Sequence, residues 1–97
     1  MISPITINIT PTIVVPINRR RANVRFQNTG GTNLYLKKIP RYGPFTVPSI
    51  TDYEVLLAPA ALLSEAGEAF STNSIAAFAV VSSAVNGVLA IYETVKI

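Results

Sequence analysis

Residues 19–38 constrain the fold more than any other stretch, because two runs of alternating apolar and polar residues flank a glycine-rich break. A period of two is typical of β-strands that bury one face. We therefore predict a β-hairpin with its turn at residues 28–31, where Gly30 and Gly31 supply the positive φ angles of a tight reversal. The expected inner positions are Ala22, Val24, Phe26, Leu34 and Leu36, and the expected outer positions are Asn23, Arg25, Gln27, Asn33, Tyr35 and Lys37.

The composition indicates a small domain that needs partners. The chain has 97 residues, 49% of them hydrophobic and only 13% charged, about half of the usual quarter. A chain of this length holds one core, so we predict a single domain over residues 1–97. It has no cysteine, so disulfides cannot compensate for a small core and oligomerisation remains the common alternative. We expect other subunits to cover part of the charge-poor surface.

The net charge of +3 conceals an uneven distribution. Seven arginines and lysines and no acidic residue precede Asp52, whereas five acidic residues and one lysine lie from Asp52 onward. Two interpretations compete: the halves form opposite faces that meet neighbouring subunits head to tail, or interleaved strands mix the signs. Interleaving is favoured, because sequence halves seldom correspond to faces in an antiparallel sandwich.

Further alternating segments surround this stretch and complete the prediction of the fold. We expect strands over residues 5–9, 12–16, 52–57 and 88–95, and a surface loop over the proline-rich residues 39–50. Residues 59–68 permit a helical turn. Residues 74–82 fit a short helix or a buried strand, and we favour a strand that pairs with 88–95 through the Asn86-Gly87 turn. The whole predicts an all-β antiparallel sandwich of about eight short strands.

Residues 69–92 carry no charge and are long enough to cross a bilayer as a helix. Polar clusters at 71–74, 82–83 and 86–87 interrupt the segment at strand-like intervals, so we favour strands and expect no membrane contact. Residues 1–18 lack the basic start and continuous apolar run of a secretory signal. We expect the chain to stay in the compartment where it is made.

Few side chains in the sequence are suited to catalysis or metal binding. The chain has no histidine, the commonest general base, and no cysteine, the thiol nucleophile of proteins. Asp52 and Glu54 would lie about 7 Å apart on one strand face, which suits the paired carboxylates of glycosidases, but a solvated strand face explains them more simply. We predict no enzymatic activity, no cofactor and no metal site.

Basic residues with interleaved aromatic rings are typical of β-sheets that bind single-stranded nucleic acid. Here Tyr35 faces outward on the predicted hairpin while Phe26 faces the core, so contact with an acidic protein surface is favoured over nucleic acid. Arg25 and Tyr35 can also pair with each other across the hairpin. A single-stranded nucleic-acid-binding domain remains the alternative from another functional class.

Several short blocks of the sequence resemble small virion proteins of tailed bacteriophages. Residues 18–20, 24–30 and 33–36 read Asn-Arg-Arg, Val-Arg-Phe-Gln-Asn-Thr-Gly and Asn-Leu-Tyr-Leu, an arginine-led strand followed by a short strand with a tyrosine. Residues 73–78 and 86–93 are similar to the C-terminal hairpin of these proteins, with its Gly-x-Leu-x-x-x-Glu ending. The resemblance implies a jelly-roll type β-sandwich that acts as a capsid decoration or cement protein.

The resemblance also implies partners and a location. Such proteins sit as trimers where capsomers meet, so the expected partners are two further copies and the major capsid protein, on a virion made in the host cytoplasm. A neck, tail or fibre-attachment component is the alternative within the same class. The expected contacts with acidic capsid surface are Arg19, Arg20, Arg21 and Arg41, and those with neighbouring subunits, by packing or strand addition, are Tyr42, Phe45, Ile5, Ile7 and Ile9.

Overall fold

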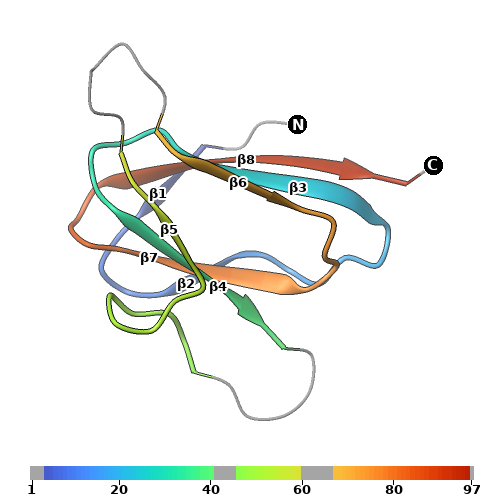
Figure 1. The fold of residues 1–97 in the computed structure, drawn as a ribbon, viewed down its shortest axis with the longest axis horizontal. Coiled ribbons are helices and arrows are strands. Elements are labelled where there is room, and N and C mark those ends of the chain that lie inside the picture. Colours follow the sequence, from blue (N-terminus) through green and yellow to red (C-terminus); the bar gives the residue numbers. More distant parts are fainter. Residues whose placement is uncertain (1–3, 41–45, 60–66, 97) are drawn as a thin grey trace.

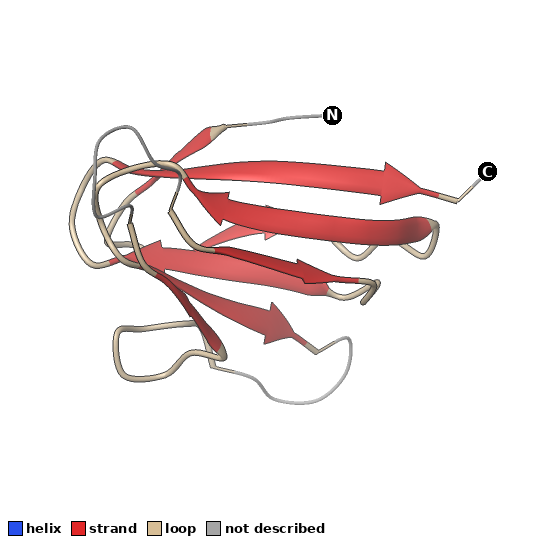
Figure 2. Ribbon diagram, turned by 45° about the horizontal axis from the view of Figure 1, so that its top comes forward, coloured by secondary structure: helices blue, strands red, loops and turns tan. Residues whose placement is uncertain are grey.

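The computed structural model describes residues 4–40, 46–59 and 67–96, which contain eight β-strands and no helix (Figure 1). The strands are β1 (Ile5–Ile7), β2 (Thr12–Val15), β3 (Arg21–Asn28), β4 (Leu34–Ile39), β5 (Val55–Leu57), β6 (Ala69–Thr72), β7 (Ala77–Ser82) and β8 (Gly87–Val95). They form two four-stranded antiparallel sheets, in the orders β1-β8-β3-β6 and β2-β7-β4-β5. The two sheets lie face to face as separate layers (Figure 2). The predicted all-β antiparallel sandwich is confirmed.

The pairing of the strands defines the topology. β1 pairs with β8, β2 with β7, β3 with β6 and β4 with β5, so the first half of the chain runs antiparallel along the second half. Contacts of β3 with β8 and of β4 with β7 then complete each sheet. This is one long double strand rolled into two layers, which is the jelly-roll arrangement. Every connection except the one between β4 and β5 passes from one sheet to the other.

The two predicted hairpins are wrong. β3 lies between β8 and β6 in one sheet, while β4 lies between β7 and β5 in the other, so residues 28–31 belong to a crossover between sheets. β7 and β8 are separated in the same way, although Asn86 does adopt the left-handed conformation of a turn, with φ of 66°. The cause of the error is that alternation reports which face of a strand is buried and carries no information on its neighbour.

The core lies between the sheets and uses the predicted inner positions of β3 and β4. Its central aromatic contact joins the two layers, with the rings of Phe26 and Phe78 5.2 Å apart between centroids. The fully or nearly buried core residues of the four long strands are Val24, Phe26, Leu34, Leu36, Phe78, Val80, Leu89 and Ile91.

Ala22 departs from the predicted pattern, because it is exposed and its neighbour Arg21 is buried. The β3–β8 register shifts between Arg21 and Asn23, and such a bulge re-aims the side chains beside it. The bulge therefore turns a charged side chain inward at the start of β3.

The remaining segments give mixed outcomes. A strand at Ala77–Ser82 confirms the choice of strand for residues 74–82, but the segment predicted as a strand over 52–57 becomes β5 only at Val55. Strand β6 was not predicted. Residues 69–92 form β6, β7 and most of β8, so the membrane-helix alternative is wrong, and the described residues include no helix that could span a bilayer. The helical turn proposed for residues 59–68 lies mostly outside the described residues.

Candidate functional site

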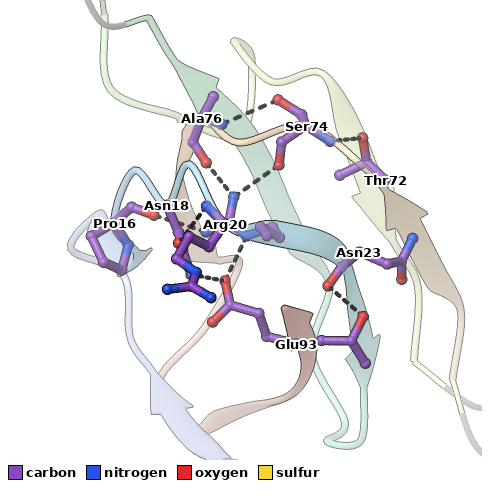
Figure 3. A network of polar contacts seen from close by, with 10 residues as sticks. Pro16, Asn18, Arg20, Asn23, Thr72, Ser74, Ala76 and Glu93 are labelled. Carbon is purple, nitrogen blue, oxygen red and sulfur yellow. Dashed lines mark hydrogen bonds and ion pairs between the residues drawn. The ribbon is translucent and has the colours of Figure 1, made fainter. Parts of the chain in front are cut away.

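Arg21 is buried and lies at the centre of a polar network at one end of the sandwich. Figure 3 shows its partners Pro16, Ser74, Ala76 and Glu93 close together. Its side chain forms an ion pair with Glu93, with 2.5 Å between Nε and Oε2. The two terminal nitrogens donate to three backbone carbonyls, those of Ser74 at 2.9 Å, Ala76 at 2.7 Å and Pro16 at 2.8 Å. Since Arg21 is only 1% exposed, its predicted contact with a capsid surface is wrong.

This network fixes two crossovers together. Pro16 follows β2, and residues 73–76 join β6 to β7, so one guanidinium holds both connections against the end of β8. The backbone N–H of Asn18 adds a direct hydrogen bond to the carbonyl of Ile75, at 2.9 Å. Arg21 therefore fixes the backbone of the surface that carries its neighbours Arg19 and Arg20.

Exposed cations gather at the same end. The backbone N–H of Lys96 donates to the carbonyl of Arg20 at 2.7 Å, and the Arg20 side chain reaches the Lys96 carbonyl at 3.4 Å. Arg19 precedes them in the chain and is also exposed. We name as the basic end the exposed cations Arg19, Arg20, Lys38 and Lys96. A contact of Arg19 and Arg20 with an acidic partner stays a prediction.

The residues of the predicted N-terminal strand differ in exposure. β1 pairs with β8, Ile7 is 1% exposed within the core and Ile5 packs against it. These two side chains support the chain's own fold. Because β1 lies at the edge of its sheet, contact of this strand with a neighbouring subunit by strand addition stays a prediction. Ile9 lies beyond β1 and is 62% exposed, which leaves it available. The other proposed contacts, Arg41, Tyr42 and Phe45, lie outside the described residues.

Ile9 belongs to a groove that sequence reasoning missed. The groove has a volume of about 410 Å³ and combines three segments that are far apart in the chain. Three of its large apolar residues stand mostly in water, Ile9 at 62%, Val47 at 55% and Ile50 at 60% exposed. We name this feature the outer groove, lined chiefly by Ile9, Pro11, Val47, Pro48, Ile50 and Val81.

The two carboxylates considered for catalysis do not lie on one strand face, since both precede β5. Asp52 accepts hydrogen bonds from Lys37, at 2.9 Å, and from Thr46, while Glu54 accepts one from the backbone N–H of Lys38, at 2.6 Å. The hydrogen bond from Thr46, followed by that from Lys37, lowers the pKa of Asp52. A general acid needs the opposite shift, so this arrangement favours a structural role.

The ion pairs support the interleaving of charge. Both join a cation of the first half of the chain to a carboxylate of the second, Arg21 to Glu93 and Lys37 to Asp52. Within the described part of the chain, these two carboxylates therefore each lie beside a cation of the other half.

The aromatic platform considered for nucleic acid is not formed as predicted. Arg25 and Tyr35 lie in different sheets, so their cross-hairpin pair is wrong. The guanidinium of Arg25 lies 5.3 Å from the ring centroid of Tyr92, and Tyr35 contacts Tyr53 with 4.9 Å between ring centroids.

Comparisons of the chain with protein-family models, curated proteins and solved structures found no match. Among the described residues, no group of three or more histidine, cysteine, aspartate or glutamate side chains is placed to hold a metal ion. The basic end and the outer groove are thus the two features on which a function can be argued.

Replacing Arg21 should strongly destabilise the fold, because Arg21→Ala removes the guanidinium that pairs with Glu93 and donates to three carbonyls. We expect a loss of about 3 kcal/mol, the lower part of the range for a broken buried pair, since the Glu93 side chain keeps 30% exposure. Urea unfolding measures the loss. Arg20→Ala is the matched control and should change stability by less than about 0.5 kcal/mol. Equal stability of the two variants would contradict the role of Arg21.

Asp52 predicts a defined pH dependence of stability. The pKa of Asp52 is lowered in the folded state from the ordinary value of 3.8, so its contribution to stability is complete well above that pH. The contribution is lost as the pH falls through the lowered folded-state pKa. The difference in unfolding free energy between the wild type and Asp52→Asn should therefore be constant from about pH 5 to 8 and shrink below about pH 4. Urea unfolding of both proteins across this range tests it, and a constant difference would refute it.

Proposed function

We propose that this chain is a structural virion protein, a decoration or cement protein that binds the outside of a bacteriophage head and has no enzymatic activity. The observation that carries the proposal is the outer groove. Three of its apolar side chains, Ile9, Val47 and Ile50, are more than half exposed in a chain that is already poor in charge. Large exposed apolar patches mark protein-interaction sites, and assembly with other subunits would cover this one.

The fold and the sequence motifs support the same proposal. The strand orders give the jelly-roll type sandwich that the resemblance to small phage virion proteins implied. Fold alone does not assign a function, because jelly rolls serve many. The proposal therefore depends on the combination of the fold, the sequence blocks at 18–36 and 73–93, and the exposed apolar groove.

A cement protein must bridge neighbours, which requires at least two separate binding surfaces. The outer groove includes Val81 near the end of β7, whereas the basic end adjoins residues 74–76, just before β7 begins. β7 has six residues, so the two surfaces lie about 20 Å apart along this strand. One molecule can therefore engage a neighbouring copy at the groove and an acidic capsid surface at the basic end.

Self-association should depend on the outer groove. We expect the purified chain to sediment as a discrete oligomer, a trimer having three times the 10.4 kDa of one chain. Ile50→Ser should shift this oligomer to the monomer, because it replaces an exposed apolar side chain of the groove with a polar one. Val95→Ser, at a residue 55% exposed near the other end of the sandwich, is the control and should leave the mass unchanged. A wild-type monomer would contradict self-assembly through the groove.

The virion role is tested in the phage whose genome encodes the chain. A decoration protein should be present in copy numbers comparable to the major capsid protein, and its deletion should leave heads that release DNA at lower temperature. Quantitative mass spectrometry of purified virions and a thermal DNA-release assay measure both. A few copies per particle would indicate the neck, tail or fibre alternative, and complete absence from virions would refute the proposal.

A further inference from the structure

We infer that the basic end holds a preformed groove for one apolar side chain of a partner protein, in a segment where carboxylates flank that side chain. We name it the end groove, lined by Ile17, Lys38, Pro40, Ser74, Ile75 and Ala76. The inference deepens the proposed function, on which it rests for placing the partner in a virion. It specifies what the partner must present: an acidic peptide segment with an apolar anchor.

The size and lining of the end groove suit a single side chain. Its volume is about 190 Å³, below the roughly 300–1,000 Å³ typical of sites that enclose a small molecule. Its walls are mostly aliphatic, and Ile17 and Ile75 are each 41% exposed, so binding would remove apolar surface from water. A branched aliphatic side chain such as leucine fits these walls.

The walls are held in place before any partner arrives. Arg21 binds the carbonyls of Ser74 and Ala76, and Asn18 binds the carbonyl of Ile75. The Ser74 hydroxyl also accepts a hydrogen bond from the backbone N–H of Ala76, at 3.3 Å. Because these bonds fix the backbone on one side of the groove, little conformational freedom is lost when a segment binds, which favours affinity.

The charge around the groove selects the flanking residues of the partner. Lys38 lines the groove, and Arg19 and Arg20 follow Ile17 closely in the chain. Neither these three cations nor Lys96 forms an ion pair with a carboxylate in the part of the chain that the structure describes.

Two carboxylates do lie nearby, and both are engaged. Glu93 is bound by Arg21, and Glu54 accepts from the backbone N–H of Lys38. The four cations of the basic end therefore exceed the two neighbouring carboxylates, one of which is neutralised by Arg21. This net positive rim is complementary to aspartate and glutamate on a partner.

The same lining favours protein over nucleic acid. Single-stranded nucleic acid is held by aromatic rings that stack with its bases, and none of the six residues that define the end groove is aromatic. The partly exposed rings of Tyr35 and Tyr92 pair with Tyr53 and Arg25, and none of these residues lines the groove.

A fluorescein-labelled short peptide with a central leucine, flanked on both sides by aspartate and glutamate, tests the inference by fluorescence polarisation. We expect saturable binding to the wild type, weakened about tenfold or more by Ile75→Ser and by Lys38→Glu. Arg25→Glu changes the net charge as Lys38→Glu does, but on a sheet face, and should retain binding. A peptide with serine in place of leucine should bind about tenfold more weakly.

Four results would overturn the inference. Equal binding of the leucine and serine peptides, or equal weakening by Arg25→Glu and Lys38→Glu, would mean general attraction of charge without use of the groove. No saturable binding of the leucine peptide would remove the site. Tighter binding of an oligothymidylate, lost in Ile75→Ser and Lys38→Glu, would assign the end groove to nucleic acid.

The peptide experiment is independent of the virion experiment. A chain that is abundant on phage heads but ignores the peptide would keep the proposed function and lose the end groove. A chain that binds the peptide but is absent from virions would keep an acidic-segment site and lose the virion role.

Discussion

A buried guanidinium holds one end of this sandwich together. In a fold where nearly every connection crosses between the sheets, the strands can keep their layers only if the crossovers are fixed, and Arg21 fixes two of them through carbonyls of Pro16, Ser74 and Ala76. Its charge is balanced by Glu93 from β8, the neighbouring strand. A neutral donor with fewer N–H groups could not satisfy four oxygen acceptors from one position, and an unpaired arginine would not be stable in this buried place.

The other end of β3 uses a neutral side chain for the same purpose. Asn28 is fully buried, and its amide nitrogen donates to the carbonyls of Thr32 at 2.7 Å and Leu57 at 2.8 Å. It thereby fixes the connection from β3 to β4 and the end of β5. The hydroxyls of Thr32 and Ser82 meet at 2.6 Å beside Gly87, where an added Cβ would come within 2.7 Å of both oxygens. One central strand, whose buried side chains are polar at both ends and apolar between them, thus orders connections at both ends of the molecule.

The fold combines features that repeat along a single strand with features that depend on residues far apart in the chain. Only the first kind could be predicted from the sequence. Alternation identified the inward faces of β3 and β4 because burial repeats every second residue along a strand, and it remained correct at Val24, Phe26, Leu34 and Leu36. Strand neighbours could not be predicted, since β3 pairs with residues more than forty positions away in the chain. The burial of Arg21 depends on a bulge opposite β8 and on a glutamate 72 residues distant, so three adjacent arginines gave no sign of which one turns inward. Both grooves were missed for the same reason, because each is assembled from segments that only the fold brings together.

The three adjacent arginines meet two different requirements, which one guanidinium cannot meet at the same time. A cation that stabilises a crossover must be desolvated and saturated with acceptors, whereas a cation that attracts a partner must keep its donors exposed. Arg21 fulfils the first condition, and Arg19 and Arg20 meet the second. Because Arg21 holds the backbone that carries its two neighbours, the proposed attraction of a partner and the stability of the fold would be joined at one end of the sandwich. A partner that binds there would meet a surface already ordered by the core, which would reduce the conformational entropy lost on binding.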